Sequence, residues 1–281
     1  KLILLNIIFF NSLILKGIKI IIFKGMESLR ISTMTAVGEL NANINLENFL
    51  SNLFPNDFIR YIETEKGNKG YAKKNDKKKR KITNRRKLFF NQGTLILFLD
   101  NKLINLKIFS NEKAKIQITG LLTEEQGIRL MDRVIDYIID MDSNFTEEQK
   151  IFNSDNINLT NFRIVMMNSD YDFKFQLNRE ELFNDLLDEG YYTTYSPDGY
   201  PGVNSKYFWN KNNETGICNC DSICDGKGCG DGDGKCRRVT MAVFQSGKMI
   251  ITGAQTMKQV EDSFNFINGF VLKNKNKYIL R

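Results

Sequence analysis

Two short segments of the chain concentrate residue types that could bind a metal or a phosphate. All five cysteines lie in the first of them: Cys218, Cys220, Cys224, Cys229 and Cys236. Four thiolates bind Zn²⁺ tetrahedrally, so any four of the five are candidate ligands, although the paired C-x-x-C spacing of common zinc sites is absent. The alternative is a flexible Gly/Asp-rich loop with free thiols. The D-G-D-G run lacks the glutamate that a calcium loop requires, which argues against calcium.

The second segment is basic. Residues 66–87 contain twelve Lys or Arg and one Asp, whereas the whole chain carries +7, so the remainder of the chain is net acidic. Such a run can neutralise several phosphates and add an affinity that falls steeply with salt. We therefore expect Arg85, Arg86 and Lys87 to contact phosphates. The alternatives are a nuclear-localisation signal and a solvated loop that binds no partner.

Catalysis, extracellular disulfides and membrane insertion are all disfavoured. The chain has no histidine, the usual general base, and no paired-carboxylate arrangement, so we expect no enzyme activity. Clustered cysteines do not form a distributed disulfide framework, which indicates an intracellular, reducing compartment. The apolar stretch within residues 1–25 is too short to span a bilayer and no cleavage site follows it. Its composition is that of translated A+T-rich non-coding DNA, so Met26 is the predicted start and no membrane partner is expected.

The chain repeats itself at an offset of 133 residues. R-I-S-T-M at 30–34 overlies R-I-V-M-M at 163–167, and N-L-E-N-F-L at 45–50 overlies N-R-E-E-L-F at 178–183. Near the end of each copy, I-T-G-L-L-T at 118–123 overlies I-T-G-A-Q-T at 251–256. Three matches in one register indicate a tandem duplication, interrupted by the basic insert in the first copy and the cysteine-rich insert in the second.

Each copy predicts the same elements. A short extended segment is followed by a helix with Asn45 or Asn178 as N-cap, then by antiparallel strands, then by a helix that begins with a T-x-x-Q capping box. The expected strands are 30–36, 94–99, 103–109 and 113–119 in the first copy, and 163–168, 239–244 and 249–252 in the second. The last helices carry apolar stripes: Ile128, Met131, Ile135 and Ile138 in one, Val260, Phe264, Ile267 and Val271 in the other. The expected fold class is α+β, with helices on one face of the sheet and the other face bare.

Two runs in the second copy carry a family resemblance. G-Y-Y-T-T-Y-S-P-D-G-Y-P-G-V at 190–203 and A-V-F-Q-S-G-K-M-I-I-T-G-A at 242–254 closely resemble the C-terminal repeat of TATA-box-binding proteins. The resemblance implies a duplicated, saddle-shaped curved antiparallel sheet with helices on its convex face. It implies domains at 26–145 (insert 66–87) and 156–273 (insert 210–237), followed by a tail at 274–281. The A+T-biased composition resembles a version from a large DNA virus or a protist, which implies the nucleus or a viral factory in the cytoplasm.

The resemblance also implies roles for single residues. Aromatic side chains of the family enter a base step and kink the duplex; the residues implied are Tyr200, Phe244, Phe109 and Phe90 (or its neighbour Phe89). The minor-groove contacts implied are Thr119, Thr252, Ile250 and Val165. The phosphate contacts implied are Lys113, Lys206 and Lys248. Asp198 is the implied contact for a partner protein.

Several positions depart from the family. Arg30 and Arg163 stand where the resemblance implies asparagine, and arginine offers only donors to the acceptors of A·T pairs. Ser32, Lys107 and Gln117 stand where it implies apolar groove contacts, and Ser32 and Gln117 remain expected groove contacts. We therefore expect minor-groove binding, with a weakened preference for a TATA sequence.

The function that these patterns predict is a non-enzymatic transcription initiation factor. It would bind and bend A+T-rich promoter DNA and recruit a B-type initiation factor and RNA polymerase. The alternative is an interaction protein that keeps the fold and tethers transcription partners with little sequence-specific DNA binding, which the polar first copy favours.

Overall fold

The computed structural model describes residues 29–71 and 89–280. Contacts between Cα atoms divide the chain into two compact units. Of the described residues, the first-repeat unit contains 33–71 and 89–165, and the second-repeat unit contains 29–32 and 166–280. Strand β1 (Arg30–Leu40) and strand β7 (Leu159–Asp172) each contribute residues to both units. The expected upstream segment 1–25 and the basic residues Arg85, Arg86 and Lys87 lie outside the described residues.

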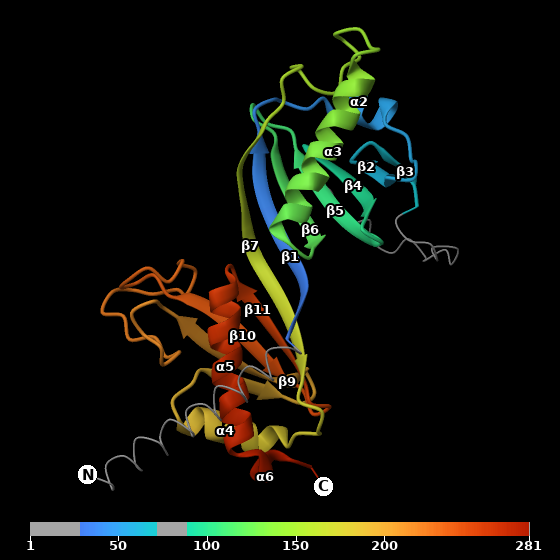
Figure 1. Ribbon diagram of the computed structural model, residues 1–281. Helices are drawn as coiled ribbons and strands as arrows, with labels where there is room; N and C mark the ends of the chain where they lie inside the picture. The colour runs from blue at the N-terminus through green and yellow to red at the C-terminus, as the bar shows by residue number, and fades with distance from the viewer. Residues whose placement is uncertain (1–28, 72–88, 281) are drawn as a thin grey trace, which may run out of the picture. The chain divides into compact units, whose positions relative to one another are not determined.

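The first-repeat unit is an antiparallel sheet with two helices on one face (Figure 1). After β1 its elements are α2 (Leu46–Asn52), β2 (Ile59–Thr64), β3 (Gly67–Gly70), β4 (Gln92–Leu99), β5 (Lys102–Phe109), β6 (Lys115–Leu121) and α3 (Glu124–Asp142). The strands are hydrogen-bonded in the order β3-β2-β4-β5-β6-β1. Helix α3 lies across the sheet, and α2 covers the end formed by β2, β3 and β4 (Figure 1).

The second-repeat unit has the same plan. After β7 its elements are α4 (Arg179–Asp188), β8 (Thr193–Ser196), β9 (Tyr200–Trp209), β10 (Arg237–Val243), β11 (Lys248–Ala254), α5 (Met257–Lys273) and α6 (Lys275–Tyr278). Its strand order is β7-β11-β10-β9-β8, and α4 and α5 pack on one face of these strands (Figure 1). The α+β class and the strand–helix–strands–helix order expected for each copy are confirmed. Among the helices of the described residues, none has the length and apolar character of a membrane span.

The predicted helix starts are confirmed in both copies. The side chain of Asn45 accepts hydrogen bonds from two backbone amides of α2, and Asn178 does the same for α4. Thr123 accepts from the amide of Gln126 at 3.1 Å, and the Gln126 side chain accepts in return from Leu122 at 2.9 Å. The glutamine side chain thus accepts from the residue before the cap. Thr256 and Gln259 repeat this arrangement in the second copy, where Gln259 accepts from the amide of Gln255. Each cap satisfies donors that the first helical turn leaves without partners.

Alternation along the strands separates a buried face from an open one. In the first-repeat unit Leu106, Ile108 and Ile116 are fully or almost fully buried, and they pack beneath the helices with Met131 and Ile138 of α3. Burial of these apolar side chains is the main favourable contribution to folding of the unit. The expected stripe on α3 is wrong at one position. Ile128 is 40% exposed, because Leu130 and Val134 occupy the inward face instead.

Two pairs of strands were not expected from the sequence. The hairpin β2–β3 at 59–70 overlaps the start of the basic insert 66–87, so Lys66 and Lys69 belong to an ordered element rather than to the charged run alone. Lys69 Nζ donates to the carbonyl of Ser51 at 2.8 Å and lies 4.0 Å from the ring centroid of Phe54. In the second copy, the hairpin β8–β9 forms where no strand was expected, between the helix after Asn178 and the strand expected at 239–244.

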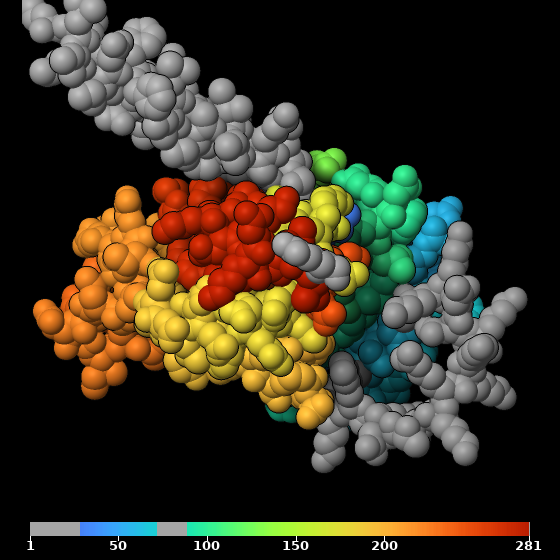
Figure 2. Space-filling model, turned by 90° about the horizontal axis from the view of Figure 1, so that it is seen from below, coloured from blue at the N-terminus to red at the C-terminus, as the bar shows by residue number. Residues whose placement is uncertain are grey.

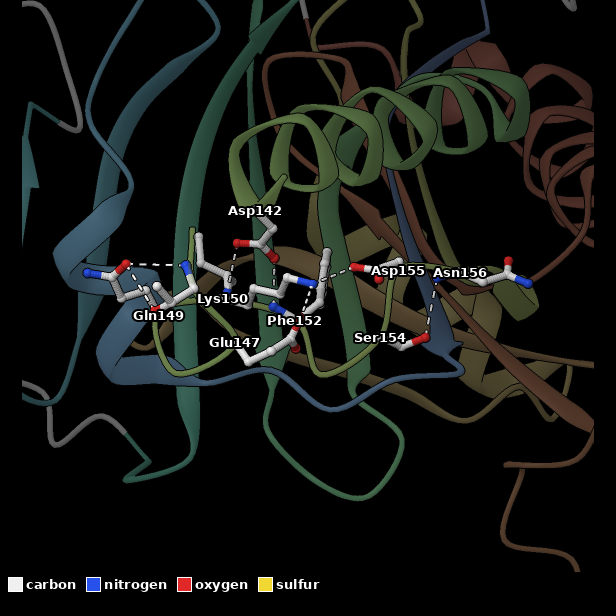
Figure 3. Close-up of polar contacts among 10 residues, drawn as sticks. Asp142, Glu147, Gln149, Lys150, Phe152, Ser154, Asp155 and Asn156 are labelled. Carbon is white, nitrogen blue, oxygen red and sulfur yellow. Dashed lines mark hydrogen bonds and ion pairs between the residues drawn. The ribbon is translucent and has the colours of Figure 1, made fainter. Parts of the chain in front are cut away.

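The segment that follows α3 is tied to the first-repeat unit by a buried carboxylate. Asp142 at the end of α3 is 4% exposed, and its two oxygens accept from the amides of Ile151 and Phe152 at 2.8 and 2.9 Å (Figure 3). Lys150 forms ion pairs with Glu147 and Asp155 on the surface of the same segment (Figure 3). These bonds attach the segment between α3 and β7 to the first-repeat unit.

Substitution of Asp142 by alanine is expected to destabilise the first-repeat unit. Two amides would lose a charged acceptor in a buried setting, which predicts a loss of about 3 kcal/mol in the free energy of unfolding. Denaturant titration measures this loss. Asp136→Ala, an exposed aspartate in the middle of α3, is the control and should change stability by less than about 0.5 kcal/mol. Equal effects of the two substitutions would contradict this role for Asp142.

Candidate nucleic-acid interface

The second-repeat unit presents a sheet face that its own helices leave open. Register places Thr252 opposite Thr240, and Ile250 opposite Ala242, so these pairs share a face. Their neighbours along the strands, including Met249 and Ile251, are fully buried beneath the helices. The residues of this second open face are Asp170 and Asp172 on β7, Lys248, Ile250 and Thr252 on β11, Arg238, Thr240 and Ala242 on β10, and Asn204, Lys206 and Phe208 on β9.

The first-repeat unit presents a corresponding open face, and it is more polar. Its residues are Val37 and Glu39 on β1, Lys115, Gln117 and Thr119 on β6, Asn105 and Lys107 on β5, and Thr94 and Ile96 on β4. Thr119 and Gln117 occupy the same register positions as Thr252 and Ile250 in the other copy. The predicted groove residues Thr119, Gln117, Ile250 and Thr252 therefore all lie on open faces, while Lys107 adds a cation to the first.

Tyr200 and Phe244 lie against each other at one end of the second open face. Their ring centroids are 5.8 Å apart with an interplanar angle of 61°, and Tyr200 is 45% exposed. A Cβ atom on Gly202 would come within 3.0 Å of Tyr200 and 3.1 Å of Phe244, so this glycine leaves space for both rings. The pair is therefore presented at the surface instead of being packed into the core.

A clamp that the sequence analysis missed fixes the backbone around this pair. Arg179, the first residue of α4, donates to the carbonyl of Pro201 at 2.6 Å and to Oε1 of Gln245 at 2.9 Å. Each acceptor is adjacent in sequence to one of the two aromatic residues. The turn at Gly247 has φ +82°, and a Cβ there would collide with the carbonyl oxygen of Phe175. Only glycine fits this turn.

The first-repeat unit has an aromatic pair at the matching place. The partner of Phe109 in this pair is Phe89 and not the preferred candidate Phe90. Phe109 contacts Phe89, with ring centroids 6.4 Å apart, whereas Phe90 is 82% exposed. Gln92 lies opposite Phe109 in the β4–β5 register, and its amide donates to the carbonyl of Phe89. This turn carries Phe89 back over the strand end, so Phe89 takes the place expected for Phe90.

The two arginines at the matching positions of the copies have different surroundings. Arg30 donates to both carboxylate oxygens of Asp170, with a closest distance of 3.0 Å. Ser32 Oγ donates to the carbonyl of Asn168 at 3.1 Å. Arg163 is exposed and Val165 is half-buried on β7. An aspartate that neutralises Arg30 competes with any acceptor on a ligand, a consequence that the sequence analysis missed.

The lysines expected to bind phosphate also differ in their surroundings. Lys248 is exposed at the start of β11, and register places Lys115, rather than the predicted Lys113, at the matching position of the first copy. Lys206 lies within the open face, where it donates to Asn204 at 2.8 Å and Thr240 at 3.0 Å. Burial, followed by the charge of Arg238, lowers the pKa of Lys206. Its ammonium group is therefore less free to follow a phosphate than that of Lys248.

Two further sets of predicted residues lie at the margins of the second-repeat unit. Asp198 is exposed in the turn between β8 and β9. Four cysteines, Cys218, Cys220, Cys224 and Cys236, gather between β9 and β10, while Cys229 lies apart and exposed. The structure thus brings four of the five candidate ligands together.

Fold and site together define a duplicated α+β protein whose units each present an open, partly cationic sheet face with an aromatic pair at its end. Residues 161–273 match the family model described as transcription factor TFIID, or TATA-binding protein. A mimivirus protein named "TATA-box-binding protein-like" is 26% identical over 260 residues, which cover 88% of this chain and 65% of that protein. The chain therefore spans about two thirds of the length of this relative.

The solved structure of Methanococcus jannaschii TBP is also similar, with 16% identity and a TM-score of 0.46, covering 89% of this chain and 99% of that one. The family-model match and the mimivirus relative confirm the resemblance that the sequence motifs indicated. Residues 161–273, which match this family model, form the second copy of the duplication.

Proposed function

We propose that the chain is a transcription initiation factor that binds A+T-rich duplex DNA through the minor groove and bends it. The single observation that carries the proposal is the partly exposed pair of Tyr200 and Phe244, fixed by Arg179 at the end of an open sheet face. Paired rings at such a position can enter a base step and partly unstack it. A core role for the pair would require burial, which is not observed.

The open faces support this mode of binding. Thr119, Thr252 and Ile250 offer small hydroxyl and apolar groups, which fit a narrow groove that displays only acceptors at A·T pairs. Lys115 and Lys248 lie where strands begin, and their ammonium groups are exposed. By the match of the second copy to this family, the helix-bearing side and Asp198 would contact a B-type initiation factor and RNA polymerase, in a nucleus or a viral factory.

Competition between duplexes tests the proposal. Labelled A+T-rich DNA bound to the full chain should be displaced by unlabelled A+T-rich duplex at a concentration at least about ten-fold lower than G+C-rich duplex requires, because the amino group of guanine blocks the groove floor. Equal displacement by the two duplexes would mean that the chain contacts only the sugar-phosphate backbone of DNA and does not distinguish the minor grooves. Absence of binding to either would overturn the proposal.

A tethering role without DNA bending is the second candidate, and one observation favours it. Asp170 and Asp172 lie on the second open face, where their carboxylates would repel phosphates. Asp170 also neutralises Arg30. A protein that keeps this fold and contacts only protein partners through its helices would tolerate such charges.

The two candidates differ in their response to Asp170→Asn. If the face binds DNA, this change removes a negative charge and frees Arg30, so affinity at 50 mM salt should rise by about three- to ten-fold, with a salt slope steeper by up to about 0.9. Stability should change little because the lost ion pair is exposed. Asp188→Asn, on the exposed side of α4, makes the same charge change away from the face and should leave affinity within about two-fold. If the two variants change the affinity for DNA by the same factor, the tethering role is favoured.

A further inference from the structure

The segment 210–236, which joins β9 to β10 and is here named the cysteine loop, lacks an apolar core of its own. It contains no helix or strand beyond isolated bridges, and Cys236 is its only buried apolar side chain. Ile223 is 99% exposed and Ile217 is 37% exposed. The loop projects from one end of the second-repeat unit (orange in Figure 2, beside red α5). A loop of this length with so little apolar burial requires another source of cohesion.

Four thiols lie at the centre of the loop. The Sγ atoms of Cys218, Cys220, Cys224 and Cys236 all lie within 4.8 Å of one another. The distance from Cys236 is 3.4 Å to Cys220 and 3.9 Å to Cys218. Sulfur atoms around a tetrahedral Zn²⁺, with bonds of about 2.3 Å, are about 3.8 Å apart. The thiol spacing therefore matches a zinc site without any rearrangement of the fold.

A side-chain donor also lies beside the thiol cluster. Asn210 Nδ2 donates to Cys236 Sγ at 3.6 Å. Such a donor can orient a sulfur ligand, as outer-shell partners do at metal centres. Gly226 and Gly234 have φ of +72° and +68°, a backbone conformation that side-chain-bearing residues rarely adopt.

The fifth cysteine is excluded by its position. Cys229 is exposed, and its thiol donates to a carboxylate oxygen of Asp231 at 3.3 Å instead of facing the other four. The carbonyl of Cys229 accepts from Gln259 Nε2 of α5 at 3.2 Å, so its backbone has a structural contact that its thiol does not share. Cys229 is therefore a matched control within the same loop.

We propose that Cys218, Cys220, Cys224 and Cys236 bind one Zn²⁺ as a structural tetrathiolate site. Each ligand loses its thiol proton to solvent on binding, and no oxidation or reduction is involved. Four protein ligands complete the tetrahedron, so no position is open for water or substrate. The site fixes the loop at the point where the carbonyl of Gly226 accepts from the amide of Arg238, at the edge of the second open face.

The full chain, expressed with zinc and purified under reducing conditions, tests the proposal by metal analysis and zinc X-ray absorption. We expect about one zinc ion per chain, with four sulfur neighbours at about 2.3 Å. The double variant Cys220→Ser/Cys224→Ser should lose most of the zinc, whereas Cys229→Ser should retain it. Zinc-free wild-type protein, a shell with oxygen or nitrogen ligands, or equal zinc loss in the two variants would overturn the proposal.

A second measurement uses the unaltered chain, so it does not depend on the folding of variants. Lys211, Lys227 and Lys235 are trypsin sites within the loop. Removal of zinc by a chelator should increase cleavage at these sites by at least about ten-fold, and returned zinc should restore protection, because local opening controls cleavage. Unchanged cleavage, or a Cys220–Cys236 disulfide that accounts for the protection, would contradict a zinc site.

Discussion

Simultaneous replacement of Tyr200 and Phe244 by alanine is expected to weaken binding to A+T-rich duplex by about 100-fold, which corresponds to about 2.7 kcal/mol. The two rings are partly exposed in the free protein and would become buried between bases in the complex, so their loss removes apolar burial that only the complex provides. Most of the bend at that end should be lost as well. Fluorescence anisotropy gives the affinity, and energy transfer between the duplex ends gives the bend.

Two controls separate insertion from general damage. Tyr192→Ala removes a tyrosine that is 64% exposed and lies outside this pair, so it should change affinity by less than about two-fold. Thermal unfolding should show little loss of stability in the double variant because the rings are not in the core. An unchanged bend in the double variant, with normal folding, would refute the wedge role of this pair.

Neutralisation of the basic run is expected to give the second large effect. Replacement of the ten Lys and Arg residues at 73–87 by glutamine preserves length and removes charge alone. If the run neutralises about four phosphates, the salt slope should fall by about 3.6, and most of the affinity at 50 mM salt should be lost while binding at 200 mM changes far less. Anisotropy titrations across that salt range measure the slope.

Two lysines are deliberately left unchanged in this variant. Lys66 pairs with Glu47 at 3.0 Å, and Lys69 bonds to backbone carbonyls at the end of α2, so both hold the β2–β3 hairpin in place. Preference for A+T-rich over G+C-rich duplex should persist, because charge neutralisation carries no sequence information. An unchanged salt slope would show that the run does not contact DNA and would favour a localisation signal or a solvated loop.

Much of the fold could be predicted because the signals were local and occurred twice. Asn45 and Asn178 cap their helices as their positions indicated, and the 133-residue offset placed corresponding strands in register. Strands β2 and β3 were missed because they lie at the start of the basic segment, where Lys66 and Lys69 were counted with the charged run. Strand β9 was missed because the Pro and Gly residues at its start are typical of turns and loops.

The candidate site was less predictable than the fold. The open-face positions of Thr119, Thr252 and Ile250 follow from alternation within strands. The clamp of Arg179 and the ion pair of Arg30 with Asp170 join residues distant in sequence, and no local pattern reports such contacts. The choice of Phe89 over Phe90 depends on one turn next to a long insert. Likewise, spacing alone could not show which four cysteines meet.

The bend in a single A+T-rich duplex, with and without a small ligand that fills the minor groove, tests the central claim most directly. Energy transfer between dyes at the two ends reports the bend when the full chain is added. We predict a bend between about 20° and 90°, as wedge insertion produces, and its loss when the ligand occupies the groove. A duplex that stays straight when bound, or a bend that the ligand does not affect, would contradict minor-groove binding by the open faces.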